Sequence, residues 1–309
     1  MKKIFSFIAI LILYLWNFET VNSEIFIKAK INNQILTNFD VKNEKNYLLA
    51  LNPSLRNLST EEINRYATDS LINENIKRIE IEKRYEIIQN KNMINKIIKD
   101  IYSGLGISNI TEFEQYLDKY GISLGLVKNK ISIEIAWNDY IFNKFNRSIL
   151  IDEDKIRDKI SKLSKQNKIE NILLSEIIFT INDNESLESK FKIIESSINK
   201  IGFEETAKIY SVSDSKKNGG NIGWVYKTQL SKKILSEIEK IDVGQLTKPI
   251  TTPGGFILLK LNDKKDEILN IDEEEQFKKA VNFEKNRQLT IYSTLQYKRV
   301  YNKSLINEF

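Results

Sequence analysis

The side chains of this chain that could do chemistry are limited to carboxylates, amines, hydroxyls and amides. Its 309 residues include no cysteine and no histidine. A disulfide, a thiolate or imidazole metal site and a Ser-His or Cys-His nucleophile are therefore impossible. Two acidic clusters, at 152–154 and 272–275, are interpreted as favourable charge at helix N-termini and not as metal ligands. We expect no metal and no cofactor.

The polar segment with the most distinctive spacing runs from Ser211 to Trp224. Serine, aspartate and lysine side chains precede an Asn-Gly-Gly-Asn sequence at 218–221, and Ile-Gly-Trp follows. Glycine accepts a positive φ without steric cost, so this pattern predicts a turn that leads into a strand. The apolar, β-branched residues 172–181 predict a buried strand earlier in the chain.

The elements around this glycine turn predict a mixed fold. Helical patterns at 186–200 and 203–209 lie between the first strand and the turn. After the turn, residues 243–250 indicate a turn with a short strand, and residues 254–261 indicate a glycine turn with a final strand. The order is strand, two helices and then three strands, which is typical of an α+β segment.

This ordered set of sequences resembles a parvulin-type peptidyl-prolyl isomerase domain. The segments that carry the resemblance are Leu-Ser-Glu-Ile-Ile-Phe (174–179), Gly-Phe-Glu-Glu-Thr-Ala-Lys-Ile-Tyr-Ser (202–211), Gly-Gly-Asn-Ile-Gly-Trp (219–224), Val-Gly-Gln-Leu-Thr-Lys-Pro-Ile (243–250) and Gly-Gly-Phe-Ile-Leu-Leu-Lys (254–260). They cover roughly a third of the chain. The resemblance implies a four-stranded antiparallel sheet with helices over residues 169–265. The alternative is an unrelated α+β domain with a glycine turn.

The resemblance also implies where a substrate proline would bind. It places the proline pocket at Ile222, Leu230 and Ile234, all of which are apolar, as such a pocket demands. The same three residues are equally compatible with an ordinary core. An isomerase holds the proline ring in such a pocket and favours the twisted amide electrostatically, and it needs no covalent step.

Three positions beside this pocket depart from the parvulin pattern. Parvulins generally place a histidine after the Leu-Ser of the first strand, a Cys or Asp before the glycine turn and a histidine in the last strand. The matching residues here are Glu176, Ser213 and Ile257. Ser213 can still donate a hydrogen bond, but Ile257 cannot, and Glu176 must be solvated, paired or shifted towards its neutral form if it is buried. We therefore expect weak or absent isomerase activity and a groove that persists as a peptide-binding surface.

The N-terminal residues predict export from the cytoplasm. A basic segment at 1–3 precedes an apolar core at 4–16, which is too short to span a bilayer of about 30 Å. The small or modest residues at 21–23 predict cleavage before Glu24. Residues 1–23 are therefore a predicted signal peptide, and the periplasm is the predicted compartment. An uncleaved N-terminal membrane anchor is the alternative.

The rest of the chain indicates mainly helices. Residues 25–31 and 35–37 predict two short strands, and Ser59 with Glu62 matches a capping box at the start of a long helix. Further helical patterns lie at 92–102, 111–120, 123–149 and 152–163, and a last one runs from Asp272 to about Tyr301.

This arrangement resembles the SurA family of periplasmic chaperones, in which the N-terminal helical region and the C-terminal helix form one core module. The sequence Ile-Asn-Asn-Gln-Ile-Leu-Thr-Asn-Phe-Asp at 31–40 is similar to the start of that family's N-terminal domain. The resemblance implies a helical chaperone domain at 24–163, the parvulin-like domain at 169–265 and a C-terminal helix within 270–309 that packs on the first domain. One parvulin-like segment is visible, whereas some family members carry two.

The charge pattern and the resemblance together predict the partners. Acidic residues are interspersed among the 47 Lys and Arg side chains, with a formal net charge of +5, which argues against nucleic-acid binding. The resemblance implies a chaperone for unfolded outer-membrane proteins and X-Pro peptides, with only transient membrane association through the signal peptide. The alternatives are an active isomerase and a chaperone tethered to the membrane at the translocon exit.

Overall fold

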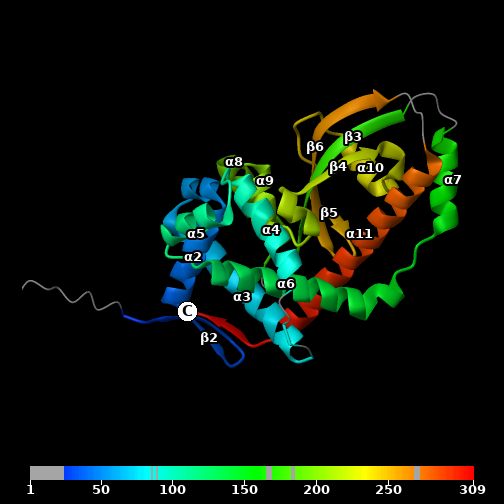
Figure 1. Cartoon of the computed structure of the whole chain (residues 1–309). Helices are drawn as coiled ribbons and strands as arrows, with labels where there is room; N and C mark the ends of the chain where they lie inside the picture. The colour runs from blue at the N-terminus through cyan, green and yellow to red at the C-terminus, as the bar shows by residue number, and fades with distance from the viewer. Residues whose placement is uncertain (1–23, 85, 88–89, 165–168, 182–184, 268–271) are drawn as a thin grey trace, which may run out of the picture.

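The structure is a computed structural model that describes residues 24–84, 86–87, 90–164, 169–181, 185–267 and 272–309 (Figure 1). The predicted signal peptide at 1–23 lies outside these residues, as does most of the predicted joint at 164–168.

The first half of the chain is mainly helical, as predicted. Its elements are β1 (Ile27–Ile31), β2 (Gln34–Thr37), α2 (Asn38–Leu51), η1 (Pro53–Asn57), α3 (Thr60–Glu82), α4 (Lys91–Gly104), α5 (Ile110–Asp118), α6 (Leu124–Phe145), η2 (Asn146–Ser148) and α7 (Glu153–Ser164). The predicted capping box is confirmed, because the Ser59 hydroxyl accepts from the main-chain NH of Glu62 and the Glu62 carboxylate accepts from that of Ser59.

The second half supplies a sheet, further helices and a final long helix. Its elements are β3 (Ile169–Phe179), α8 (Leu187–Ile201), α9 (Phe203–Tyr210), η3 (Asp214–Asn218), β4 (Asn221–Tyr226), η4 (Lys227–Gln229), α10 (Lys232–Ile238), β5 (Ile250–Thr252), β6 (Gly255–Glu267), α11 (Glu273–Tyr301) and β7 (Ile306–Glu308). Helix α11 begins as predicted, because the Asp272 carboxylate accepts from the main-chain NH groups of Glu274 and Glu275. Helix α10 and strand β7 were not predicted.

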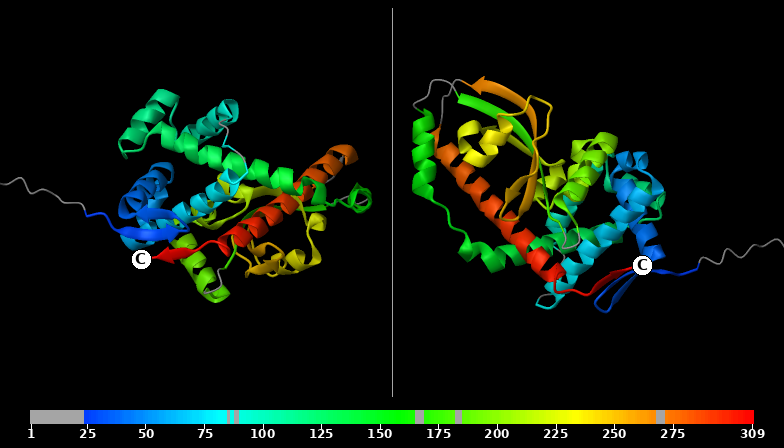
Figure 2. Two further views of the ribbon diagram at one scale, coloured as in Figure 1. Left: turned by 90° about the horizontal axis from the view of Figure 1, so that it is seen from below. Right: turned by 180° about the vertical axis from the view of Figure 1, so that it is seen from behind.

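The C-terminal helix packs on the N-terminal helices. Trp137 of α6 donates from Nε1 to the Ser293 hydroxyl of α11 at 2.8 Å, and Phe145 stacks on Tyr292 with ring centroids 4.7 Å apart. Strand β7 then pairs with β1 in a three-stranded sheet of order β2-β1-β7. Figure 2 shows both ends of the described chain in this small sheet. The two ends of the sequence therefore complete one helical module, which we define as 24–164 with 272–309.

Residues 169–267 form the predicted four-stranded antiparallel sheet, in the order β4-β3-β6-β5. Helices α8 and α9 pack on one face, around a cluster that contains Ile177 and Leu258. Apolar residues of α10 pack on the other face, around a cluster that contains Leu174 and Leu259. Successive residues of a strand point to opposite faces, which explains why residues next to each other in β3 belong to different clusters.

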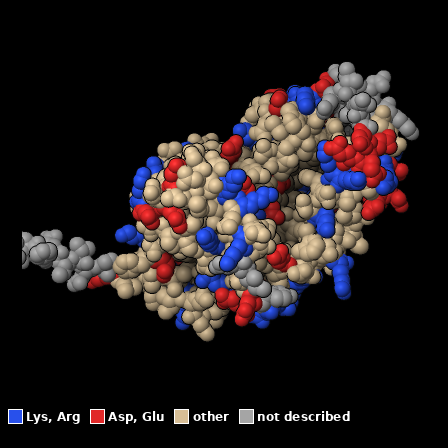
Figure 3. All heavy atoms as spheres, in the orientation of Figure 1, with Lys and Arg blue, Asp and Glu red and all other residues tan. Residues whose placement is uncertain are grey.

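The sheet domain meets the helical module at several places, two of which lie at α9 and at the turn between β5 and β6. Tyr66 of α3 meets Tyr210 of α9 edge to face, with ring centroids 5.2 Å apart, in an apolar cluster that also includes Ile201 of α8. At the other place, the turn between β5 and β6 brings Gly254 against Ile291 of α11. Figure 1 shows α10 on the side of the sheet that faces α11. On the face drawn in Figure 3, basic and acidic side chains are interspersed.

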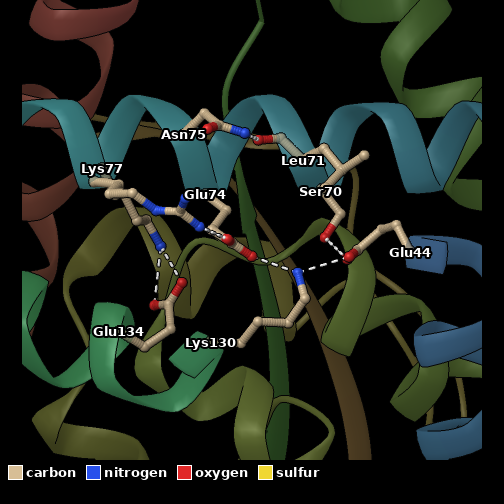
Figure 4. A network of polar contacts seen from close by, with 9 residues as sticks. Glu44, Ser70, Leu71, Glu74, Asn75, Lys77, Lys130 and Glu134 are labelled. Atoms are coloured by element: carbon tan, nitrogen blue, oxygen red, sulfur yellow. Dashed lines mark hydrogen bonds and ion pairs between the residues drawn. The ribbon is translucent and has the colours of Figure 1, made fainter. Parts of the chain in front are cut away.

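A network of charged side chains lies inside the helical module (Figure 4). Lys130 of α6 contacts the carboxylates of Glu44, at 2.6 Å, and Glu74, and it is 11% exposed. Lys77 of α3 lies next to this group, with Nζ 2.7 Å from a carboxylate oxygen of Glu134 on α6. These contacts join α2, α3 and α6, and each of the three carboxylates Glu44, Glu74 and Glu134 has a lysine partner.

Candidate functional site

The polar centre of the candidate site is the carboxyl group of Glu176 on β3. Its Oε1 accepts a hydrogen bond from the Ser213 hydroxyl at 2.6 Å and another from the Ser215 hydroxyl at 2.9 Å. Both serines belong to the turn that begins at η3, and Ser213 caps that turn through its main chain and hydroxyl. The structure therefore brings the predicted residues Glu176 and Ser213 into direct contact.

The glycine turn holds this loop against β3. Gly219 and Gly220 both have a positive φ, of 63° and 80°, as the Asn-Gly-Gly pattern predicts. The main-chain NH of Glu176 donates to the Gly220 carbonyl at 2.8 Å, and a Cβ at Gly220 would overlap the main-chain oxygen of Glu176. A side chain cannot fit at Gly220 without moving the loop away from the strand.

The surroundings of Glu176 favour its neutral form. Burial raises the pKa of its carboxyl group, and the hydrogen bonds from Ser213 and Ser215 lower the pKa by less, so the net direction is upward. Hydroxyl groups can accept as well as donate, so they serve a protonated carboxyl as well as a carboxylate. The cluster can thus offer both donors and acceptors to the main chain of a bound peptide.

An apolar surface lies on the same face of the sheet as Glu176. Glu176 pairs with Leu259 of β6, and Ile178, two residues further along β3, pairs with Ile257. Ile257 is 7% exposed, and it belongs to one apolar cluster with the half-buried residues Ile222, Leu230 and Ile234. The three residues of the predicted pocket and Ile257 therefore belong to one cluster on the face of the sheet that carries Glu176. Their individual roles remain predictions.

Two contacts of this region were missed by the sequence analysis. Ser215 is a second hydroxyl partner of Glu176, and Lys233 of α10 donates from Nζ to the main-chain oxygen of Thr251 on β5 at 2.8 Å. Two serines flanking Asp214 were a visible signal, because a tight turn can direct alternate side chains to one side. No pattern in the sequence indicates that the turn is helical, so Ser215 was not predicted as a partner of Glu176.

The chemistry of the described residues is that of a binding surface more than of a metal centre. Within the described ranges, no group of three or more acidic side chains is placed to hold a metal ion. The geometry offers an apolar surface, two hydroxyls and one carboxyl in a small area. This is the combination expected where a peptide binds through an apolar side chain and its main chain.

Comparison with known proteins identifies the domain. Residues 172–263 match the family described as Rotamase, the PPIC-type PPIASE domain. Among curated proteins, the chain is 25% identical over 205 residues to Chaperone SurA of Pseudomonas aeruginosa, an alignment that covers 64% of this chain and 49% of that protein. It is 27% identical over 203 residues to Foldase protein PrsA 2 of Bacillus cereus, covering 65% of this chain and 62% of that protein.

A solved structure titled as one of two structurally related SurA-like chaperones of Campylobacter jejuni aligns with 92% of this chain and 98% of its own, at 15% identity and a TM-score of 0.36. The assignment therefore depends on the sequence matches and not on this structure. The chain spans about half the length of the curated SurA proteins that it matches. Residues 172–263 are thus a parvulin domain of the PPIC type, and the chain that carries it is SurA-like.

Proposed function

We propose that this protein is a chaperone that binds non-native polypeptide segments outside the cytoplasm, and that its parvulin domain serves as a binding surface with weak or absent isomerase activity. The matches to a SurA chaperone and to a PrsA foldase support the chaperone part. Binding of many clients needs a broad apolar surface with adaptable hydrogen-bonding groups more than a finely tuned catalytic site.

The observation that supports the proposal is a cluster of one carboxyl group and two hydroxyls, in which Glu176 and Ser213 stand where the resemblance expects a histidine and a Cys or Asp. The Glu176 carboxyl group accepts hydrogen bonds from Ser213 and Ser215, and the apolar cluster around Ile257 lies on the same face of the sheet. The chain contains no histidine, so no other residue can restore an imidazole network. The apolar residues that we propose as the proline-binding surface form one cluster, while the histidines that parvulins generally place around it are absent from the chain.

Unfolded outer-membrane proteins in the periplasm are the proposed clients. Their transmembrane strands alternate apolar and polar residues and carry aromatic girdles, which suits a half-buried apolar surface with polar neighbours. The predicted signal peptide at 1–23 supports export. In the part of the chain that the structure describes, no helix combines the length and the apolar character needed to cross a bilayer.

An aggregation assay with an unfolded β-barrel protein tests the chaperone proposal. We expect the full chain to suppress aggregation at a stoichiometric ratio. Leu230→Ala should weaken suppression several-fold, because Leu230 is half-buried in the proposed pocket. Val243→Ala is the matched control, because Val243 is 45% exposed and lies outside that cluster. Unimpeded aggregation in the presence of the wild-type chain would reject the proposal.

A working isomerase is the second candidate function. The raised pKa of the Glu176 carboxyl and its two hydroxyl partners place proton donors beside the apolar cluster, where they could stabilise a twisted prolyl amide. A protease-free assay on an X-Pro peptide separates the candidates. If the wild-type chain accelerates cis/trans isomerisation of the peptide and both Ser213→Ala and Leu230→Ala abolish the acceleration, the protein is an isomerase. If the peptide isomerises at the same rate with and without the wild-type chain, it is not.

A chaperone tethered to the membrane at the translocon exit is the third candidate. It requires residues 1–23 to stay on the mature protein. Mass spectrometry of the protein isolated from its host decides between the forms. An N-terminus at Glu24 supports the periplasmic form, and an intact apolar segment supports the tethered form.

A further inference from the structure

A polar cavity lies where the parvulin loop meets the helical module. Its volume is about 80 Å³, and it is bordered by α3, α6, α11 and the segment around η3. The residues that carry charge at its wall are Lys77, Glu134, Asp214 and Lys216. Each part of the protein thus contributes one acid and one base to the same small space.

Lys77 and Glu134, the two charged residues from the helical module, form a close ion pair. Lys77 donates from Nζ to both carboxylate oxygens of Glu134, at 2.7 and 2.9 Å. Burial alone would raise the pKa of Glu134, but the charges of Lys77 and Lys216 outweigh burial and bring that pKa to about 2. Glu134 is therefore ionised at neutral pH, and it attracts the loop lysine as well as its own partner.

Of the two charged loop residues at the cavity wall, Asp214 and Lys216, Lys216 is less screened by water. The Asp214 side chain is 70% exposed, so water screens its charge. Lys216 is half-buried and lies at the wall of the cavity. Its neighbour Lys217 is 50% exposed, lies 3.7 Å from the Asp214 carboxylate and does not border the cavity, and its charge lowers the pKa of Glu134 less than the charge of Lys216 does. The two adjacent lysines therefore differ in environment, which provides a matched pair for experiment.

The same loop carries the hydroxyl partners of Glu176. Ser213 and Ser215 point to the Glu176 carboxyl group, whereas the alternate residues Asp214 and Lys216 border the cavity. The main chain is held tightly between these positions, because the NH of Lys216 donates to the Ser213 carbonyl at 3.1 Å. A displacement of Lys216 must therefore be passed on to both serines.

We propose that Lys216 is a positioning residue, which couples the helical module to the parvulin site by holding the 213–216 loop between Glu134 and Glu176. In this arrangement, docking of the parvulin domain keeps the serine hydroxyls on the Glu176 carboxyl group. When the domain moves away from the helices, the loop loses its charged anchor and the site loosens. The shape of the peptide-binding surface thus depends on whether the two parts are in contact.

The test is a titration of the Glu176 carboxyl group by NMR on the full chain with 13C-labelled glutamate, assigned with Glu176→Gln. Lys216→Met should shift the Glu176 pKa downward towards its ordinary value, because a released loop admits water. The direct loss of a positive charge would shift that pKa upward, so the sign separates positioning from simple electrostatics. Lys216→Arg should restore the wild-type titration, and Lys217→Met should leave it unchanged.

A second measurement follows the loop itself. The Gly220 amide donates to the Ser215 carbonyl at 2.9 Å, and its hydrogen exchange should be faster in Lys216→Met and unchanged in Lys217→Met. Equal effects of the two lysine variants, or an upward shift of the Glu176 pKa, would overturn the proposal. Neither measurement uses a client or a proline peptide, so its failure is distinct from a failure of the proposed chaperone function.

Discussion

Glu134 in the helical module and Glu176 in the parvulin domain are both carboxyl groups drawn away from bulk water, yet their pKa values move in opposite directions. Burial opposes ionisation of both, but Glu134 is held by the charges of Lys77 and Lys216, whereas Glu176 is held by two serine hydroxyls. Hydroxyl partners cannot offset the loss of water around a carboxylate as fully as a lysine does. The charge state of each group therefore follows from its partner.

From this difference we infer separate tasks for the two regions. Ion pairs fix the helices of the module at defined positions, and removal of one partner leaves an uncompensated charge. A carboxyl group with hydroxyl partners can exchange one of them for the main chain of a peptide at little cost. The module is thus built for rigidity, and the parvulin site is built for exchange of partners.

The largest expected effect comes from removing the lysine between two carboxylates. Lys130→Met should lower the free energy of unfolding by about 3–5 kcal/mol, because Glu44, which is 2% exposed, would lose its cation and Glu74 would keep only Arg78. Urea unfolding measures this loss. Lys192→Met is the control, because Lys192 is 70% exposed and pairs on the surface. A loss below about 1 kcal/mol would show that the network adds little to rigidity.

The next effect tests the main chain of the parvulin site. Gly220→Ala should cost about 3 kcal/mol, because Gly220 has a φ of 80° and an added Cβ would overlap the Glu176 main chain. Gly223→Ala is the matched control, with a φ of 81° and open space around the added Cβ, so it should cost about 1 kcal/mol. Equal losses in the two variants would mean that the contact with β3 is unimportant.

A smaller effect is expected in acid from Glu134. Its pKa of about 2 lies below the ordinary value of about 4.3, so the stability it contributes is present above pH 4.3 and is lost as the pH falls towards 2. Because 36% of the side chain is accessible, screening should limit this contribution to about 1–2 kcal/mol. Urea unfolding of wild type and Glu134→Gln between pH 2 and 5 measures it. If the free energies of unfolding of the two proteins change in the same way with pH, Glu134 does not have a lowered pKa.

The smallest effect is expected at Glu176, with the opposite dependence on pH. Since its folded pKa is raised, the carboxyl group lowers stability as the pH rises from the unfolded pKa through the folded one. Glu176→Gln should therefore be as stable as wild type at pH 4 and more stable by up to about 1 kcal/mol at pH 7. Its amide oxygen can still accept from both serines. A variant that is less stable at pH 7 would show that Glu176 is ionised and paired.

Much of the fold could be predicted because local patterns and tertiary structure agree. The capping residues Ser59 and Asp272 begin α3 and α11, and the glycine turn leads into β4. Strand β7 was missed, because three residues carry too little pattern and the strand exists only through its pairing with β1. Helix α10 was missed because it is only seven residues long.

The candidate site could be predicted only through the resemblance to parvulins. No local pattern indicates that Glu176 meets Ser213, since 37 residues separate them and the contact depends on the register of β3 with the glycine turn. The cavity at Lys216 could not be predicted at all, because its wall combines residues from the helical module and the parvulin domain. Contacts between distant segments are set by packing, which no single segment encodes.

We propose that the parvulin surface binds proline-containing segments with little or no acceleration of their isomerisation. NMR exchange spectroscopy on one sample of the full chain with an excess of an X-Pro peptide measures both properties at once. We expect shifted signals for Ile222, Leu230 and Ile234 and a rate of cis/trans exchange close to that of the peptide alone. Unshifted signals at these residues, or an exchange rate that rises with the protein and falls again in Glu176→Gln, would contradict it.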